Sequence, residues 1–198
     1  MIPRNLQISM VVLFIAVLLL AVYMRNMRGR VSQSPAAGDA RPIAPPAAGP
    51  SEQAALYVAY DSPGILHAQP ARIPLPSGRQ QRAQELLQAL LQIYLGKNSP
   101  HALPPGADIR DVYIVDPGLA VIDLNGAFAD GHRSGVLVEE LSVASLVQTL
   151  GANIPGLNRV KILVDGKERD TLAGHADLSR YYETAVVAKL AEQLASAQ

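Results

Sequence analysis

The best candidate for acid–base chemistry is a histidine two residues before an aspartate. His175 and Asp177 lie in Ala-Gly-His-Ala-Asp-Leu-Ser, residues 173–179. Alternate residues of an extended segment share a face, so the two side chains could orient each other as acid and base. Gly174 favours another interpretation, since glycine permits an unusual backbone turn in which both side chains hydrogen-bond the loop. We expect this loop-structuring role.

The remaining residues give little support for a metal or a cofactor. The four histidines, His67, His101, His132 and His175, are far apart and show no HxH or HxxxH spacing. The lack of cysteine excludes disulfides, cysteine zinc sites and thiol catalysis. We expect neither metal nor cofactor, and convergence of distant histidines in space stays open as an alternative.

Glu139 and Glu140 form the most prominent acidic pair. Adjacent residues of a helix point about 100° apart, so the two carboxylates would not converge on one substrate atom. Near the start of a helix they would complement its dipole. We keep Glu140 as a possible contact for a partner.

No serine lies in a Gly-x-Ser-x-Gly elbow and no glycine-rich phosphate loop is present, so we expect no enzyme activity.

An α+β domain must position these residues. Periodic apolar residues predict helices over 79–95, 136–150 and about 182–196, and apolar runs predict strands over 54–60, 65–73, 111–115, 119–124 and 159–164. We expect one small, mostly antiparallel sheet with two to three helices mainly on one face. The strand over 119–124 is apolar on both sides, which predicts a central strand covered on both faces. Tyr113 is expected in the core.

A tight turn is predicted at Asp165 and Gly166. The chain after it, residues 167–172, would return as a polar edge strand. Such an edge can add to another chain's sheet, although its charges protect it from unspecific pairing. Asp165 and Gly166 are therefore kept with Gly174, His175 and Asp177 as residues that structure a loop or contact a partner.

The N-terminal region predicts a membrane anchor and a spacer. After a short tail (1–7), Ile8 to Met24 reads ISMVVLFIAVLLLAVYM, and residues 5–24 carry no charge. This length suits a transmembrane helix, and no small-x-small cleavage site follows it. A cleaved signal peptide stays the alternative. Residues 25–51 are rich in proline and alanine, which predicts an extended linker before the folded unit, 52–198.

Charge argues against a nucleic-acid partner. The chain has a net charge of zero, with the positive excess in residues 1–51 and an acidic remainder. The folded unit thus lacks the basic surface that phosphate backbones require. Three arginines follow the apolar segment closely and one precedes it, which taken alone favours a cytoplasmic C-terminus.

Three stretches resemble the GerM domain family. They are LPPGADIRDVYIVDPGLAVIDLNGAF (103–128), the segment from Glu139 to Val164, and Asp165-Gly166-Lys167 followed by TLAGHADLS (171–179). The resemblance covers roughly residues 54–180. It implies a bacterial envelope protein held at the membrane by a lipidated cysteine or an N-terminal helix. It also implies a link to sporulation and germination, similarity to ring-building modules and no enzymatic activity.

Together these observations lead to one expectation with two alternatives. We expect a single-pass protein of the cytoplasmic membrane whose C-terminal domain lies outside the cytoplasm, because the resemblance outweighs the arginine count. It would act by binding a protein partner or itself. One alternative is a peptidoglycan or small-ligand module, for which Tyr181 and Tyr182 offer the aromatic surface. The other is an enzyme that uses His175, Asp177 and Glu140.

Overall fold

The computed structural model describes residues 50–196 apart from 77, 116 and 117, with side chains to residue 193. The predicted tail, the predicted membrane helix (Ile8 to Met24) and almost all of the predicted linker lie outside these residues. Among the described residues, no helix combines the length and the apolar character that crossing a bilayer requires.

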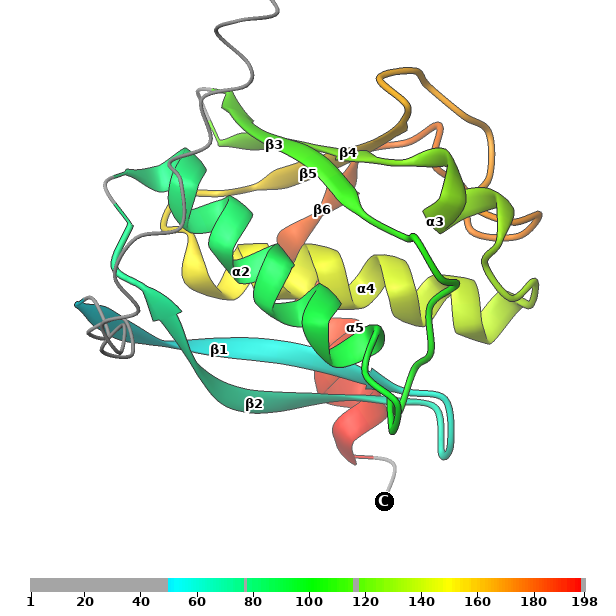
Figure 1. The fold of residues 1–198 in the computed structure, drawn as a ribbon, viewed down its shortest axis with the longest axis horizontal. Helices are drawn as coiled ribbons and strands as arrows, with labels where there is room; N and C mark the ends of the chain where they lie inside the picture. Colours follow the sequence, from blue (N-terminus) through cyan, green and yellow to red (C-terminus); the bar gives the residue numbers. More distant parts are fainter. Residues whose placement is uncertain (1–49, 77, 116–117, 197–198) are drawn as a thin grey trace, which may run out of the picture. The chain divides into compact units, whose positions relative to one another are not determined.

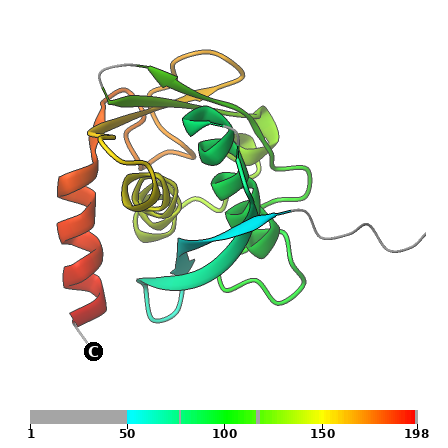
Figure 2. The same ribbon diagram turned by 90° about the vertical axis from the view of Figure 1, so that its left-hand side faces the viewer.

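The described chain forms three layers (Figures 1 and 2). A two-stranded antiparallel sheet forms one outer layer, and a four-stranded sheet of order β3-β4-β5-β6 forms the other. Two long helices, α2 and α4, lie between the sheets, and α5 packs beside α4. The strands are β1 (Ser51–Tyr60), β2 (Ile65–Pro74), β3 (Ile109–Val115), β4 (Leu119–Leu124), β5 (Arg159–Val164) and β6 (Tyr182–Glu183). The helices are α2 (Arg79–Tyr94), α3 (Gly126–Asp130), α4 (Val136–Asn153) and α5 (Thr184–Ser196).

The α+β class is confirmed, but the expectation of one sheet is wrong. The hairpin of β1 and β2 forms a sheet of its own instead of joining the other strands. The reason lies in α4. Every residue from Leu141 to Leu150 is buried, so no side of the helix faces solvent along this stretch. A helix that is buried on every side needs cover from several elements. The four-stranded sheet, the hairpin, α2 and α5 supply that cover, so the helices lie between two sheets.

The four-stranded sheet is mixed rather than mostly antiparallel. β4 pairs with β3 in antiparallel register and with β5 in parallel register. The parallel pair follows from the long crossover through α3 and α4, which returns the chain to the same end of the sheet. This topology places the start of α4 near the ends of β4 and β5.

Only one face of the four-stranded sheet is covered by helices (Figure 1). β4 is central as predicted, but Leu119 and Val121 on its outer face are half-buried, and none of the described helices lies over them. Tyr113, expected in the core, points to this outer face and is 44% exposed. Both expectations are therefore wrong for the outer face, while Ala120 and Ile122 on the inner face are fully buried.

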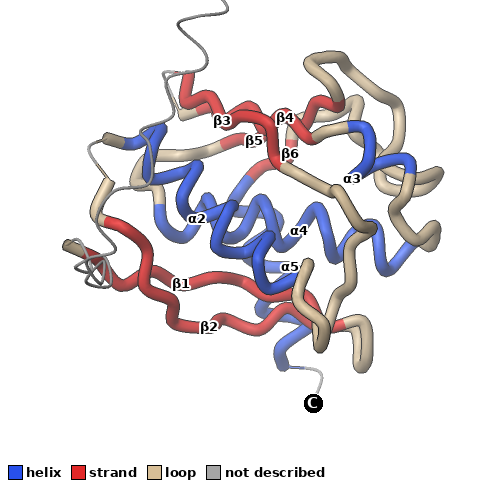
Figure 3. The backbone as a smooth tube through the Cα atoms, viewed as in Figure 1, coloured by secondary structure: helices blue, strands red, loops and turns tan. Residues whose placement is uncertain are grey.

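The predicted edge strand over 167–172 is a loop (Figure 3). Asp165 and Gly166 do form the predicted tight turn, with φ values of 51° and 72°. A single bridge between Val164 and Lys167 follows the turn, and the chain then leaves the sheet. It leaves because the backbone further along is bound by side chains of α4 and β5. The loop over 167–181 therefore replaces the expected sheet edge.

Candidate functional site

The centre of the candidate site is the buried carboxylate of Glu139, in the first turn of α4. Its side chain has no exposed surface. Oε2 accepts hydrogen bonds from the backbone N–H groups of Ala173 (2.9 Å), His175 (2.9 Å) and Ala176 (3.0 Å). Oε1 accepts from Gly135 N–H (3.1 Å) and contacts the ring Nδ1 of His175 (2.9 Å). One carboxylate thus binds the loop over 171–178 to the start of α4.

These hydrogen bonds decide the ionisation of Glu139. Burial by itself raises the pKa of a carboxyl group, because it penalises the charged form. The hydrogen bonds from the His175 ring and from the N–H groups of Ala176, Ala173 and His175 act in the opposite direction. They bring the pKa of Glu139 down to about 2. The group is therefore a carboxylate at neutral pH, committed to the loop and unsuited to proton transfer at that pH.

The structure separates the two members of the predicted acid–base pair. His175 turns to Glu139, and its Nδ1 also lies 3.3 Å from Ser134 Oγ. Asp177 instead accepts hydrogen bonds from the backbone N–H (2.9 Å) and hydroxyl (2.6 Å) of Ser179. These bonds lower the pKa of Asp177. No hydrogen bond or ion pair links His175 with Asp177 in the described part of the chain. Gly174 has a φ of 122°, as the loop-turn interpretation requires.

The other predicted residues lie at separate places. Gly166 donates its backbone N–H to Asp123 Oδ1 (2.7 Å), and Asp165 Oδ1 accepts from Arg110 Nη1 (3.2 Å). Glu140 faces away from Glu139 and lines a groove between α4 and α5. The six residues that the sequence singles out therefore do not form one site.

A second polar cluster is built around Ser142, one turn along α4 from Glu139. Its hydroxyl lies 2.5 Å from His101 Nε2 and 2.6 Å from His132 Nε2. On the far side of His101, Nδ1 contacts Asp61 Oδ1 at 2.6 Å. Arg133 contacts the other oxygen of Asp61 at 3.0 Å. Two histidines distant in sequence do converge, but through a serine.

The histidine cluster does not hold a metal-binding arrangement. In the part of the chain that the structure describes, no three histidine, aspartate or glutamate side chains are grouped as metal ligands. Burial is the largest influence on both imidazoles and lowers the pKa of His101 and of His132. Both rings are therefore neutral at pH 7.

The contacts run from Asp61 through His101 to Ser142, as in the Asp–His–Ser triad of a serine hydrolase. The surroundings of this serine differ from those of a catalytic serine. A catalytic serine must reach a substrate carbonyl, with N–H donors placed for the developing oxyanion. Ser142 is 1% exposed, and its hydroxyl also lies 3.2 Å from the carbonyl oxygen of Val138, a further acceptor for its single hydrogen. Three grooves on the described surface are lined by other residues. The arrangement joins segments of the fold and offers no access to a substrate.

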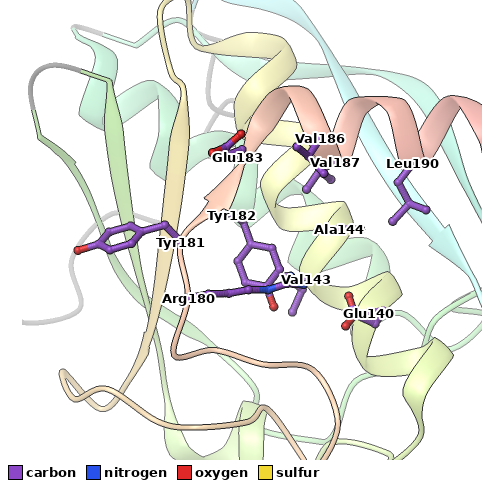
Figure 4. A pocket seen from close by; sticks show the side chains of 10 residues that line it. All are labelled: Glu140, Val143, Ala144, Arg180, Tyr181, Tyr182, Glu183, Val186, Val187 and Leu190. Carbon is purple, nitrogen blue, oxygen red and sulfur yellow. The ribbon is translucent and has the colours of Figure 1, made fainter.

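A groove lies between α4 and α5 on the described surface (Figure 4). It has a volume of about 350 Å³. Tyr182 lies at its base with its ring under the guanidinium of Arg180, at 4.7 Å, while Tyr181 points away from it. Lining residues are Glu140, Val143, Ala144, Arg180, Tyr181, Tyr182, Glu183, Val186, Val187 and Leu190.

Sequence reasoning missed the partners of Glu139 and the whole cluster around Ser142. A signal for the second was present, because Ser142 lies in a largely apolar helix and a buried hydroxyl needs partners. The identity of those partners was not visible, since Asp61, His101 and His132 come from three separate loops.

Comparison with known families gives a clear match. The family model named Germane, described as sporulation and spore germination, matches residues 55–170, more than half of the chain. No curated protein matches the chain.

Three similar solved structures come from two bacteria. A candidate lipoprotein of Clostridium perfringens is 25% identical, with 72% of this chain and 93% of that chain covered and a TM-score of 0.47. The first GerMN domain of the sporulation protein GerM from Bacillus subtilis is 22% identical, with 64% and 92% covered and a TM-score of 0.47. The tandem GerMN domains of the same protein are 21% identical, with 65% and 44% covered and a TM-score of 0.48.

Proposed function

Because the chain belongs to the Germane family of sporulation and spore germination, we propose that it is a non-catalytic envelope protein that acts by binding other proteins. The proposal includes association with a second copy of itself. The family assignment carries the link to sporulation and germination, and the chemistry of the described residues supports the non-catalytic role.

The observation behind the non-catalytic role is where the chemically capable side chains direct their polar atoms. Glu139 is fully buried and bound to four backbone N–H groups. Ser142 is buried between two imidazoles. Groups whose hydrogen-bonding capacity is used by the fold stabilise it and are not free to activate a substrate. An enzyme built on His175 and Asp177 gains no support, because each side chain has a different partner.

The exposed apolar side chains support a role in association. Val186 and Leu190 lie one helical turn apart on α5 and are 61% and 40% exposed. Both line the groove beside α4. Exposed apolar side chains that gather along a hollow are typical of surfaces that bind another molecule.

We further propose that residues 8–24 anchor the chain in the cytoplasmic membrane and that the described domain lies outside the cytoplasm. The apolar, uncharged leader supports the anchor. Residues 25–51 would then separate the domain from the lipid surface.

Cross-linking of the full-length chain in its native membrane tests the proposed association. We expect discrete cross-linked species, and we expect Val186→Asp to reduce their yield several-fold, because a buried carboxylate without a partner weakens a contact. Ala185→Asp is the matched control, since it places the same charge one residue away on an exposed position of α5 outside the groove. A chain that stays monomeric without any cross-linked partner would contradict the proposal.

The groove also keeps peptidoglycan or a small ligand as a second candidate. Its volume falls within the usual range of ligand pockets, roughly 300–1,000 Å³. Sugar rings stack on exposed aromatic faces, yet Tyr182 is buried, and Tyr181 has Arg159 and Lys161 near its ring at 5.4 and 5.6 Å. Sedimentation of the full-length chain with purified peptidoglycan decides this. Binding that Tyr181→Ala removes would favour the second candidate.

A further inference from the structure

The cluster around Ser142 contains four short polar contacts in series. They join Asp61 Oδ1 to His101 Nδ1 (2.6 Å), His101 Nε2 to Ser142 Oγ (2.5 Å), and Ser142 Oγ to His132 Nε2 (2.6 Å). The fourth joins His132 Nδ1 to the backbone carbonyl oxygen of Arg133 (2.8 Å). Each contact is short enough to require one hydrogen between its two atoms.

Counting hydrogens shows that the neutral cluster lacks one. The Asp61 carboxylate and the Arg133 carbonyl only accept, so Nδ1 of both imidazoles must carry the hydrogen. Nε2 of each neutral ring is then an acceptor, and both face the single hydroxyl of Ser142. Ser142 has one hydrogen to donate, and the carbonyl oxygen of Val138, 3.2 Å away, competes with the two rings for it. At most three hydrogens therefore serve the four short contacts, and at least one contact sets two lone pairs against each other.

We propose that this cluster is a binding site for a single proton, which lies between Nε2 of His101 and Oγ of Ser142. His101 then donates to Ser142, and Ser142 donates to His132, so each of the four short contacts has its hydrogen. His101 rather than His132 takes the charge because Asp61 lies against it and compensates the imidazolium.

The surrounding charges limit the cluster to one proton. The two imidazole rings are 6.0 Å apart, so charging both places like charges close together in a buried site. Arg133 also pairs with the Asp61 carboxylate, so this one negative charge is shared between Arg133 and the protonated His101. The other titratable groups facing the cluster are Glu139, committed to its own loop, and Tyr94, whose ring is 5.0 Å from His101.

The site responds to mild acid. Burial lowers the pKa of both histidines, so the proton binds below pH 6.5, the ordinary value for histidine. Its uptake completes a hydrogen-bonded chain from the β1–β2 turn (Asp61) through the loop carrying His101 to α4 and the loop before it. A proton thereby couples four segments of the fold.

Imidazole 15N NMR of the full-length, histidine-labelled chain between pH 8 and 5 tests this directly. Protonated and unprotonated ring nitrogens are read separately, and the chain has four histidines. We expect His101 Nε2 to gain a hydrogen as the pH falls while His132 Nε2 stays unprotonated. Joint protonation of both rings, or no uptake by His101 before the fold is lost, would overturn the proposal.

Two variants separate the proton site from ordinary titration. In His132→Gln the amide N–H₂ donates to Ser142 Oγ and supplies the missing hydrogen at every pH, so we expect the uptake by His101 to be lost. Asp61→Asn keeps an acceptor for His101 Nδ1 but removes the charge, so uptake should shift to lower pH. His67→Gln, at an exposed position of β2, is the matched control and should leave the titration of His101 unchanged. Wild-type titration of His101 in both test variants would contradict the hydrogen count.

Discussion

At the scale of single residues, burial and hydrogen bonding assign different roles to neighbours of the same type. Glu139 is enclosed and bound by the loop over 171–178, whereas Glu140, the next residue, lines an open groove. A carboxylate that accepts several backbone N–H bonds acts as a fixed anchor for them. Glu139 is therefore central to holding this loop on the domain, while Glu140 is available to solvent or a partner.

Replacing Glu139 with glutamine should destabilise the domain by about 3 kcal/mol. The amide would keep one acceptor oxygen but direct its N–H₂ group at backbone donors. Urea denaturation followed by circular dichroism measures the loss. Glu140→Gln is the matched control and should change the free energy of unfolding by less than about 0.5 kcal/mol. Equal effects of the two substitutions would argue against the anchoring role.

Acid should destabilise the domain in two separate ranges of pH. The lowered pKa values of His101 and His132 mean that the unfolded chain binds protons more readily, so stability falls as the pH drops below about 6.5. Glu139 contributes stability above its ordinary pKa of 4.5, and this is lost as the pH falls toward about 2. That shift corresponds to roughly 3 kcal/mol.

Denaturation curves recorded from pH 8 to pH 2.5 should show both losses. Glu139→Gln should remove only the one below pH 4.5, and His132→Gln should reduce only the one that begins near pH 6.5. A free energy of unfolding that does not change between pH 7 and pH 3 would contradict both assignments.

Tyr94→Phe should cost about 1–3 kcal/mol, although it deletes a single oxygen. Tyr94 Oη accepts the backbone N–H of Ala59 at 2.8 Å, and burial raises the pKa of this phenol to about 12. Phenylalanine would leave a buried N–H without an acceptor. Thermal unfolding measures the loss. Tyr113→Phe, at an exposed position on the outer face of β3, is the control and should leave the melting temperature nearly unchanged.

At the scale of elements, the connections determine how the layers meet. Lys161 on β5 is 4% exposed and donates to the carbonyl oxygens of Leu178 (3.0 Å) and Ser179 (2.6 Å). Together with Glu139 it holds the loop over 167–181 against both the sheet and α4. The loop is therefore fixed from two elements, which explains why it does not continue as an edge strand.

The turn between β3 and β4 should not tolerate a side chain at Gly118. Gly118 has a φ of 97°, and a Cβ there would lie 2.4 Å from the carbonyl oxygen of Gly156. We expect Gly118→Ala to cost about 1–3 kcal/mol or more in the free energy of unfolding. Gly78→Ala is the control, because Gly78 is extended and a Cβ would have nothing within 4 Å. A neutral Gly118→Ala substitution would show that the turn can move away from Gly156.

At the scale of the whole molecule, the sequence places an apolar, uncharged leader before the described domain, which is layered around α4. The apolar leader predicts that the full-length chain stays with the membrane pellet after alkaline carbonate washing. Deletion of residues 1–24 should release the protein into the soluble fraction. Release of the intact chain would contradict the anchor, and a mature N-terminus after residue 24 would show that the leader is a cleaved signal.

The sequence by itself determined the positions of the long helices, the apolar strands, the Asp165–Gly166 turn and the family. These features depend on local periodicity and on residue types in a fixed order. Only the tertiary structure decided that β1 and β2 form their own sheet, that Glu139 rather than Glu140 is enclosed, and that Asp61, His101 and His132 meet at Ser142. Such choices depend on which distant surfaces cover α4. A helix that is buried on every side does not specify in its own sequence pattern which element covers which side.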